Sequence, residues 1–274
     1  MALVTLPDGY RMYVEDVGDG FPVIFLHGGP GLDHTMWRPW LDALADEFRL
    51  LYVDERGQGR SDRVDPATLT LAVWAGDVDL LSATLELDRF ALVGHSFGAI
   101  ITTTHAIDRG TAEAYVISGG GDSSAALEAD VAASLDALGD DGAAIAKSWE
   151  DERTVETEAE FAALMEVQMP FHFWGAAPPD FGASTVYAPE VLRHAANMGY
   201  GDFDYPSHLE RVRKPTLVMV GEHDRTTTPR AARVLHDGIA GSELVVIPAA
   251  GHMSYVESPD VYVDALRGFL RGIA

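Results

Sequence analysis

The chain has 274 residues, no cysteine and a formal net charge of −24 at pH 7. The absence of cysteine excludes disulfides, thiolate chemistry and cysteine-based metal sites. Binding to nucleic acid needs clustered lysine and arginine, and anionic membrane surfaces repel acidic proteins, so we expect neither as a partner. The sequence has no membrane-spanning stretch and no signal-peptide pattern, which favours a cytoplasmic protein.

Short apolar runs alternate with helical stretches over residues 1–121. We expect strands at 10–17, 23–26, 50–53, 90–93 and 114–117, and helices at 70–87 and 99–108. Short apolar strands between helices are typical of a mainly parallel sheet that is covered on both faces. This part of the chain is therefore predicted to be the first part of an α/β core.

The pattern changes over residues 122–207, where alanine and acidic residues dominate. Amphipathic helices are predicted at 123–138 and 150–167, and an aromatic segment broken by prolines follows at 169–181. We interpret this region as a helical cap inserted into the core. The second part of the core is predicted at 208–274, with strands at 215–220 and 244–247 and helices at 229–239 and 259–270.

The most informative motif is Gly94-His95-Ser96-Phe97-Gly98, which lies between a predicted strand and a predicted helix. In that context the G-x-S-x-G pattern predicts a sharp turn that exposes the serine hydroxyl. The glycines are needed because they have no Cβ to crowd the strand and the helix. Ser96 is therefore the predicted nucleophile.

A serine hydroxyl is a weak nucleophile that needs a histidine base, and a carboxylate orients that base. Asp224 and His252 each come shortly after a predicted strand, as Ser96 does. Open α/β sheets place their sites at the carboxyl ends of the strands. We therefore predict a triad of Ser96, Asp224 and His252. Asp122, which follows an earlier strand, is an alternative acid that the sequence leaves open.

A glycine-rich loop, His27-Gly28-Gly29-Pro30-Gly31, follows the predicted strand at 23–26. Such a loop can turn backbone N–H groups toward the negative charge that develops on a substrate oxygen. The N–H of Phe97, directly after the nucleophile, is one predicted donor to this oxyanion. The N–H of Gly29 is the other.

Aromatic side chains of the predicted cap are candidates for substrate binding, namely Trp149, Phe171 and Trp174. The histidines outside the motifs show no spacing typical of metal ligands, so no metal is predicted. No cofactor is expected for the serine chemistry described above.

Together these motifs resemble those of the α/β-hydrolase-fold serine hydrolases, and among them the proline-iminopeptidase-like subgroup. The matching segments are His27-Gly28-Gly29-Pro30-Gly31, Asp54-Glu55-Arg56-Gly57-Gln58-Gly59-Arg60-Ser61-Asp62, Gly94–Gly98, Gly221-Glu222-His223-Asp224 and Gly251-His252-Met253. The resemblance implies an α/β-hydrolase fold, with a mostly parallel eight-stranded sheet, helices on both faces and an inserted helical cap. It implies the same roles for the triad and for the two oxyanion donors.

These residues predict a cofactor-independent serine hydrolase that cleaves a small ester, lactone or amide through an acyl-enzyme on Ser96. Aminopeptidases of the similar subgroup hold the substrate's amino group with acidic side chains, one of which directly follows the catalytic aspartate in some members. Here Arg225 takes that place. A proline iminopeptidase is the second hypothesis, in which a cap acid such as Glu150, Glu152, Glu166, Asp202 or Asp204 would hold the amino group, and the sequence singles out none of them. A small-molecule receptor on a hydrolase fold is the third.

Overall fold

A computed structural model describes residues 2–198 and 201–274. Met1, in the predicted first part of the core, and residues 199–200, in the predicted cap, lie outside the described residues. Within the described ranges the strands form one eight-stranded sheet in the order β1-β2-β4-β3-β5-β6-β7-β8. The strands are β1 (Ala2–Thr5), β2 (Arg11–Val17), β3 (Phe21–Leu26), β4 (Phe48–Val53), β5 (Ala91–His95), β6 (Ala114–Ser118), β7 (Thr216–Gly221) and β8 (Glu243–Ile247).

The sheet is mostly parallel, and its central strands are buried on both faces. β1 pairs with β2, and β2 with β4, in antiparallel register, whereas the other neighbouring strands are parallel. In β3, Ile24 and Leu26 belong to the core on one face, and Val23 and Phe25 to the core on the other. Burial on both faces explains why the central strands are continuous apolar runs in the sequence.

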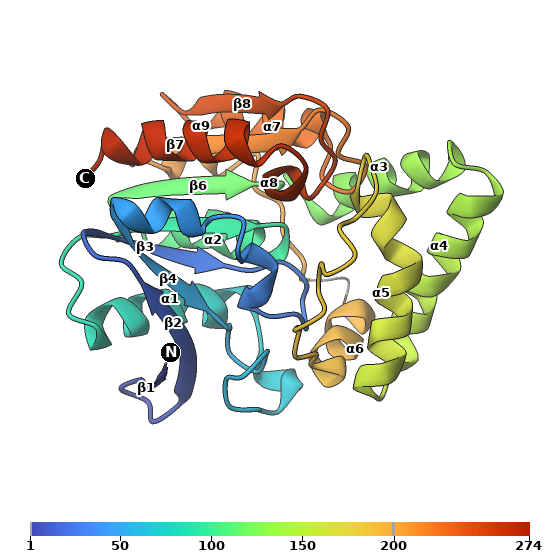
Figure 1. The fold of residues 1–274 in the computed structure, drawn as a ribbon, viewed down its shortest axis with the longest axis horizontal. Coiled ribbons are helices and arrows are strands. Elements are labelled where there is room, and N and C mark those ends of the chain that lie inside the picture. The colour runs from blue at the N-terminus through green and yellow to red at the C-terminus, as the bar shows by residue number, and fades with distance from the viewer. Residues whose placement is uncertain (1, 199–200) are drawn as a thin grey trace.

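Helices cover both faces of the sheet, as Figure 1 shows. The α-helices of the described residues are α1 (Leu71–Thr84), α2 (Phe97–Asp108), α3 (Ser124–Asp136), α4 (Asp140–Asp151), α5 (Glu158–His172), α6 (Pro189–Asn197), α7 (Pro229–Gly238), α8 (Ser254–Glu257) and α9 (Pro259–Arg271). Side chains of α1, α2 and α7 belong to one core cluster, and those of α8 and α9 to the other. The predicted α/β-hydrolase fold is confirmed.

Four helices, α3 to α6, lie between β6 and β7 in the chain and beyond the carboxyl ends of the parallel strands (Figure 1). The two ends of this segment are joined, because the Tyr205 N–H donates to the Asp122 carbonyl at 2.9 Å. The segment also has a small apolar cluster of its own around Phe161 and Leu192. The boundaries at 121/122 and 207/208 stay predictions. In the described part of the chain, no helix has the length and apolar character that a membrane crossing requires.

The prediction of one helix over 150–167 is wrong. The chain leaves the helical conformation at Val155, and a separate helix, α5, begins directly after Thr157. The Thr157 hydroxyl accepts from the Glu160 N–H at 3.2 Å, and the Glu160 carboxylate accepts from the Thr157 N–H at 3.0 Å. This reciprocal cap begins α5, after the preceding helical segment has ended at Thr154. α5 then continues through Pro170, where the sequence suggested a break, and ends two residues later.

Candidate active site

Ser96 lies at the turn between β5 and α2, with φ 55° and ψ −115°. This left-handed conformation costs a non-glycine residue about 1–3 kcal/mol. Backbone hydrogen bonds hold it, because the Ser96 N–H donates to the Ser118 carbonyl at 3.0 Å and the Ser96 carbonyl accepts from the Ile100 N–H at 3.1 Å. A Cβ added at Gly94 would lie 2.1 Å from the Gly98 carbonyl oxygen. The glycine spacing of the motif is therefore a steric requirement of this turn.

Gly94→Ala is expected to lower the free energy of unfolding by about 2–3 kcal/mol, because the new methyl group meets rigid backbone. Gly268→Ala in α9 is the control, since nothing lies within 4 Å of a Cβ at that position. The free energy of unfolding of the control should rise by about 0.5–1 kcal/mol, because alanine has a higher helix propensity than glycine. Urea denaturation followed by circular dichroism measures both variants. A G94A variant as stable as the wild type would contradict the steric role.

The side chains of Asp224 and His252 are hydrogen bonded to each other and buried. His252 Nδ1 donates to Asp224 Oδ2 at 2.8 Å. Because a carboxylate only accepts, the proton lies on Nδ1, and Nε2 keeps the lone pair that can take a proton from a serine hydroxyl. The N–H groups of Thr226 and Thr227 donate to Asp224 Oδ1 at 2.8 and 2.9 Å. The Thr227 hydroxyl donates to Oδ2 at 3.0 Å, so the carboxylate is held in place on both oxygens.

Asp122, the alternative acid, is held by an arginine. Arg230 Nη2 donates to Asp122 Oδ1 at 2.7 Å, and Arg230 Nη1 donates to Oδ2 at 3.1 Å. The structure therefore brings Asp224 against His252 and places Asp122 against Arg230.

The glycine-rich loop after β3 passes close to Ser96, since a Cβ at Gly28 would lie 3.2 Å from Ser96 Cβ. Several of its backbone groups already have partners. The Gly28 N–H contacts the Met36 sulfur at 2.9 Å, and the Gly31 N–H donates to Gln58 Oε1 at 2.5 Å. These contacts fix the path of the loop beside the serine.

Two N–H groups near the serine are left unused. The Gly98 N–H, the second of α2, donates to the His27 carbonyl at 2.9 Å. The N–H of Phe97, the first residue of α2, and the N–H of Gly29 take part in no hydrogen bond among the described residues. Helix N-termini leave such donors free, and Gly29 and Phe97 line the same cavity as Ser96. Among the described residues, both predicted donors thus keep an unused N–H group and line the cavity with Ser96.

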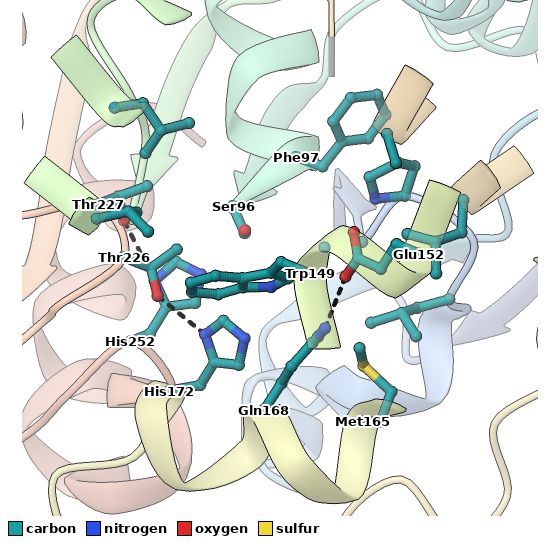
Figure 2. Close-up of a pocket in the computed structure, with 18 of the residues that line it drawn as sticks. Ser96, Phe97, Trp149, Glu152, Met165, Gln168, His172, Thr226, Thr227 and His252 are labelled. Atoms are coloured by element: carbon teal, nitrogen blue, oxygen red, sulfur yellow. Dashed lines mark hydrogen bonds between the residues drawn. The ribbon is translucent and has the colours of Figure 1, made fainter. Parts of the chain in front are cut away.

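A cavity of about 450 Å³ opens over Ser96 and His252 (Figure 2). Its lining comes from the core and from the helices α3 to α6. The apolar lining side chains include Leu32, Met36, Ile100, Val131, Phe161 and Met165. The charged and amide side chains of the lining are Glu128, Glu150, Glu152, Arg153 and Gln168. A cavity of this size and character suits a small organic substrate.

The three aromatic residues predicted to bind substrate have different positions. Trp149 lines the cavity (Figure 2). Phe171 is buried and packs edge-on behind Trp149, with 5.1 Å between ring centroids. Trp174 is outside the cavity lining in the described residues, because the chain turns to the surface after α5 ends. Its ring is 49% exposed and stacks on His223 at 3.7 Å, and the Arg225 guanidinium lies 5.6 Å from its centre.

Two more imidazoles flank His252. The ring of His172, at the end of α5, lies 5.4 Å from that of His252, and the ring of His95 lies 4.6 Å from it. Burial lowers the pKa of His172 to about 3 and holds the pKa of His95 well below its usual range. Both rings are therefore uncharged near neutral pH and do not repel a proton on His252. His172 Nδ1 lies 2.9 Å from the Thr226 hydroxyl, which fixes its ring in the cavity wall (Figure 2).

The sequence analysis did not single out His172, Thr227 or Gln168. A signal for Thr227 was present, because a threonine three residues after an aspartate is typical of a turn that caps the carboxylate. No spacing marks His172 or Gln168, which come from α5 and reach the cavity only through the packing of that helix on the core. Within the residues that the structure describes, no cluster of three or more His, Asp or Glu side chains is arranged to hold a metal ion.

Residues 23–265 match the alpha/beta hydrolase family, which is most of the chain. The chain belongs to this family. A proline iminopeptidase of Lactobacillus crispatus is 26% identical over 289 residues, covering 96% of this chain and 95% of that protein. A proline iminopeptidase of Lactiplantibacillus plantarum is 28% identical over 290 residues, covering 96% and 98%. A thermophilic esterase from Thermogutta terrifontis has a solved structure with a TM-score of 0.72, 27% sequence identity, and coverage of 99% of this chain and 98% of that chain.

These similarities, spread over nearly the full length, establish that the protein is an enzyme and a hydrolase of the proline-iminopeptidase-like type. The hypothesis of a receptor without turnover is therefore not retained.

Proposed function

We propose that the hydrolase cleaves a small carboxylic ester, lactone or amide through an acyl-enzyme on Ser96. The observation that carries the proposal is the hydrogen bond of 2.8 Å from His252 to Asp224, at the wall of a cavity that Ser96 also lines. This arrangement supplies a nucleophile, a base with a free Nε2, and a group that orients the base.

In the proposed reaction, Ser96 Oγ attacks the carbonyl carbon of the substrate and His252 Nε2 takes the hydroxyl proton. The N–H groups of Gly29 and Phe97 donate to the oxyanion of the tetrahedral intermediate. The bond to the leaving group then breaks, and His252 returns the proton to that group. A water molecule next attacks the acyl-enzyme, again giving its proton to His252, and this proton returns to Ser96 as the carboxylic acid departs.

The size and the lining of the cavity favour a substrate with a small apolar acyl or leaving group. Its volume is about 450 Å³, and Ile100, Phe161 and Met165 give it apolar walls. Apolar walls also exclude water and so strengthen the hydrogen bonds to a developing oxyanion. The similarity to the Thermogutta terrifontis esterase supports the ester class.

A second candidate function is the release of proline from the N-terminus of peptides, which the similarity to proline iminopeptidases supports. The specific observation in its favour is a carboxylate in the cavity. Glu152 is 2% exposed and lines the cavity, where it accepts from Gln168 Nε2 at 2.8 Å (Figure 2). A buried carboxylate in the cavity lining attracts the secondary ammonium group of an N-terminal proline. Arg225 lies beside Trp174, outside the cavity lining of the described residues.

The two functions are separated by p-nitrophenyl butyrate and L-proline β-naphthylamide. We expect the wild-type hydrolase to cleave the ester. If it is also a proline iminopeptidase, it cleaves the prolyl amide, and Glu152→Gln raises the KM for this amide at least about 10-fold because the ammonium group loses its buried counter-charge. The KM for the ester should stay within about twofold, since the ester has no ammonium group.

Glu150→Gln is the matched control, because Glu150 lines the same cavity but is exposed. It should change the KM for the prolyl amide less than Glu152→Gln does. Cleavage of the ester alone would reject the iminopeptidase function. Cleavage of neither substrate, nor of a panel of short esters and lactones, would reject the ester and lactone hydrolase.

A further inference from the structure

A buried pair of titratable side chains, His27 and Glu55, holds the glycine-rich loop on the side away from the cavity. Their exposed fractions are 0% and 3%. His27 Nδ1 donates to the Gly28 carbonyl at 2.6 Å, and His27 Nε2 contacts the Glu55 carboxylate. Because a carbonyl only accepts, Nδ1 carries a proton, and Nε2 and the carboxylate can stay in contact only if one of them carries a second proton. The pair therefore holds two protons in this arrangement.

The bond from His27 fixes the peptide unit that supplies one oxyanion donor. The Gly28 carbonyl and the Gly29 N–H belong to the same peptide plane, and in a trans peptide they point in opposite directions. The bond that holds the carbonyl toward His27 therefore turns the Gly29 N–H to the other side of the loop. Gly29 and Ser96 both line the cavity on that side.

Gln58 ties the loop to the same pair at a second point. Its side-chain amide donates to Glu55 Oε2 at 3.4 Å, and its Oε1 accepts from the Gly31 N–H at 2.5 Å. The loop is thus held on both sides of Gly29. His27 bonds to it before Gly29 and Gln58 bonds to it after Gly29, and both side chains contact Glu55.

We propose that His27 and Glu55 are positioning residues for the oxyanion site, and that this site keeps its shape only while the pair retains both protons. The inference rests on the proposed acyl-enzyme function, because an oxyanion site matters only for a reaction with a tetrahedral intermediate. Neither side chain touches the substrate, and both act through the orientation of the Gly28–Gly29 peptide.

The charges around the pair favour retention of its protons near neutral pH. Burial by itself lowers the pKa of His27, but the adjacent Glu55 carboxylate, with Asp54 behind it, outweighs burial and raises this pKa to about 9. Asp77 lines a small void together with Glu55 and is itself paired with Arg56 at 2.6 Å. The hydrogen bond to the Gly28 carbonyl also raises the pKa of His27.

Loss of a proton from the pair breaks the bond to the loop. The remaining proton stays on Nε2, because the anionic Glu55 carboxylate attracts it more strongly than the neutral Gly28 carbonyl does. Nδ1 then presents a lone pair to the Gly28 oxygen, and the two repel each other. The peptide is no longer held, and the Gly29 N–H no longer points reliably toward the oxyanion.

The first test is the dependence of kcat/KM on pH for p-nitrophenyl butyrate, corrected for uncatalysed hydrolysis. The wild type should lose activity above about pH 9. Glu55→Gln should lack this loss, because the new amide donates to Nε2 and neutral His27 then keeps its proton on Nδ1 at every pH. A wild-type profile that is flat beyond about pH 10, or the same alkaline loss in E55Q, would overturn the proposal.

The second test separates the hydrogen bond from simple packing. The double variant H27N/E55Q keeps an N–H donor where Nδ1 lies, and H27A/E55Q removes it. H27A/E55Q should lower kcat about 100-fold with KM within about threefold, since an oxyanion donor acts mainly in the transition state. H27N/E55Q should recover at least about 10-fold of that loss. Equal kcat values for the two double variants overturn the positioning role.

Ser96→Ala, measured in the same assay, separates this proposal from the proposed function. Ester turnover that survives this substitution refutes the acyl-enzyme and the oxyanion role together. If Ser96→Ala is inactive while E55Q keeps the wild-type alkaline loss, only the positioning role of the pair fails. The wild-type profile needs no variant, so the proposal stays testable even if E55Q does not fold.

Discussion

Replacement of Ser96 by alanine is expected to lower kcat for p-nitrophenyl butyrate about 10⁵-fold, because the variant lacks the hydroxyl that is proposed to form the acyl-enzyme. Activity left in the variant would come from the oxyanion donors and from substrate binding alone. Steady-state kinetics of both proteins, with uncatalysed hydrolysis subtracted, give the ratio.

Ser148→Ala is the control for the loss of a serine hydroxyl. Ser148 is buried in α4, and its hydroxyl donates to the Ile145 carbonyl of the same helix at 2.7 Å. The kcat of the Ser148→Ala variant should stay within about threefold of the wild-type value. A Ser96→Ala variant that keeps more than about 1% of wild-type kcat would contradict the role of Ser96 as nucleophile.

The second large effect concerns the acid of the triad. Asp224→Asn should lower kcat about 10⁴-fold, because an amide in place of the carboxylate no longer holds His252 with its proton on Nδ1. The fold should persist, since the amide oxygen can still accept from the two threonine N–H groups that now bind Asp224 Oδ1. Kinetics with p-nitrophenyl butyrate and a circular dichroism spectrum check both statements.

Asp122→Asn is the matched comparison, because it tests the alternative that the sequence left open. This change removes the ion pair with Arg230 and should cost stability, while kcat stays within about fivefold. If Asp122→Asn lost as much activity as Asp224→Asn, or more, the assignment of the acid would have to be reversed.

The sheet topology explains why sequence reasoning brought the core residues together. The predicted roles fall on residues that follow four strands, β3, β5, β7 and β8, which run parallel in one sheet. The carboxyl ends of parallel strands share one edge, so motifs far apart in the chain meet there. Apolar runs mark β3, β5 and β7 clearly because these central strands are buried on both faces.

The helices between β6 and β7 were harder to predict, because their packing depends on contacts with the core that leave little trace in the sequence. Thr157 and Glu160 did carry a local signal for a helix start, which the prediction of one helix over 150–167 overlooked. Trp174 shows the other difficulty. Its aromatic character suggested a substrate contact, but its direction is set by the end of α5, and it stacks on His223 at the surface.

The contact between His27 and Glu55 was not predicted, although both residues lie in motifs that the sequence shows. β3 and β4 are neighbours with Leu26 opposite Val53, so His27, directly after β3, lies close to Glu55, the second residue after β4. A carboxylate near a histidine at the end of an adjacent parallel strand could have been inferred only once the strand order was known.

The most direct test of the central claim is to find the nucleophile by covalent trapping. The hydrolase is inactivated with diethyl p-nitrophenyl phosphate, digested and analysed by tandem mass spectrometry. We predict a single diethylphosphoryl group on Ser96, with activity lost in proportion to its incorporation, and much slower labelling of the Asp224→Asn variant. Fully inactivated enzyme in which Ser96 is unmodified, or in which another residue carries the group, would contradict an acyl-enzyme on Ser96.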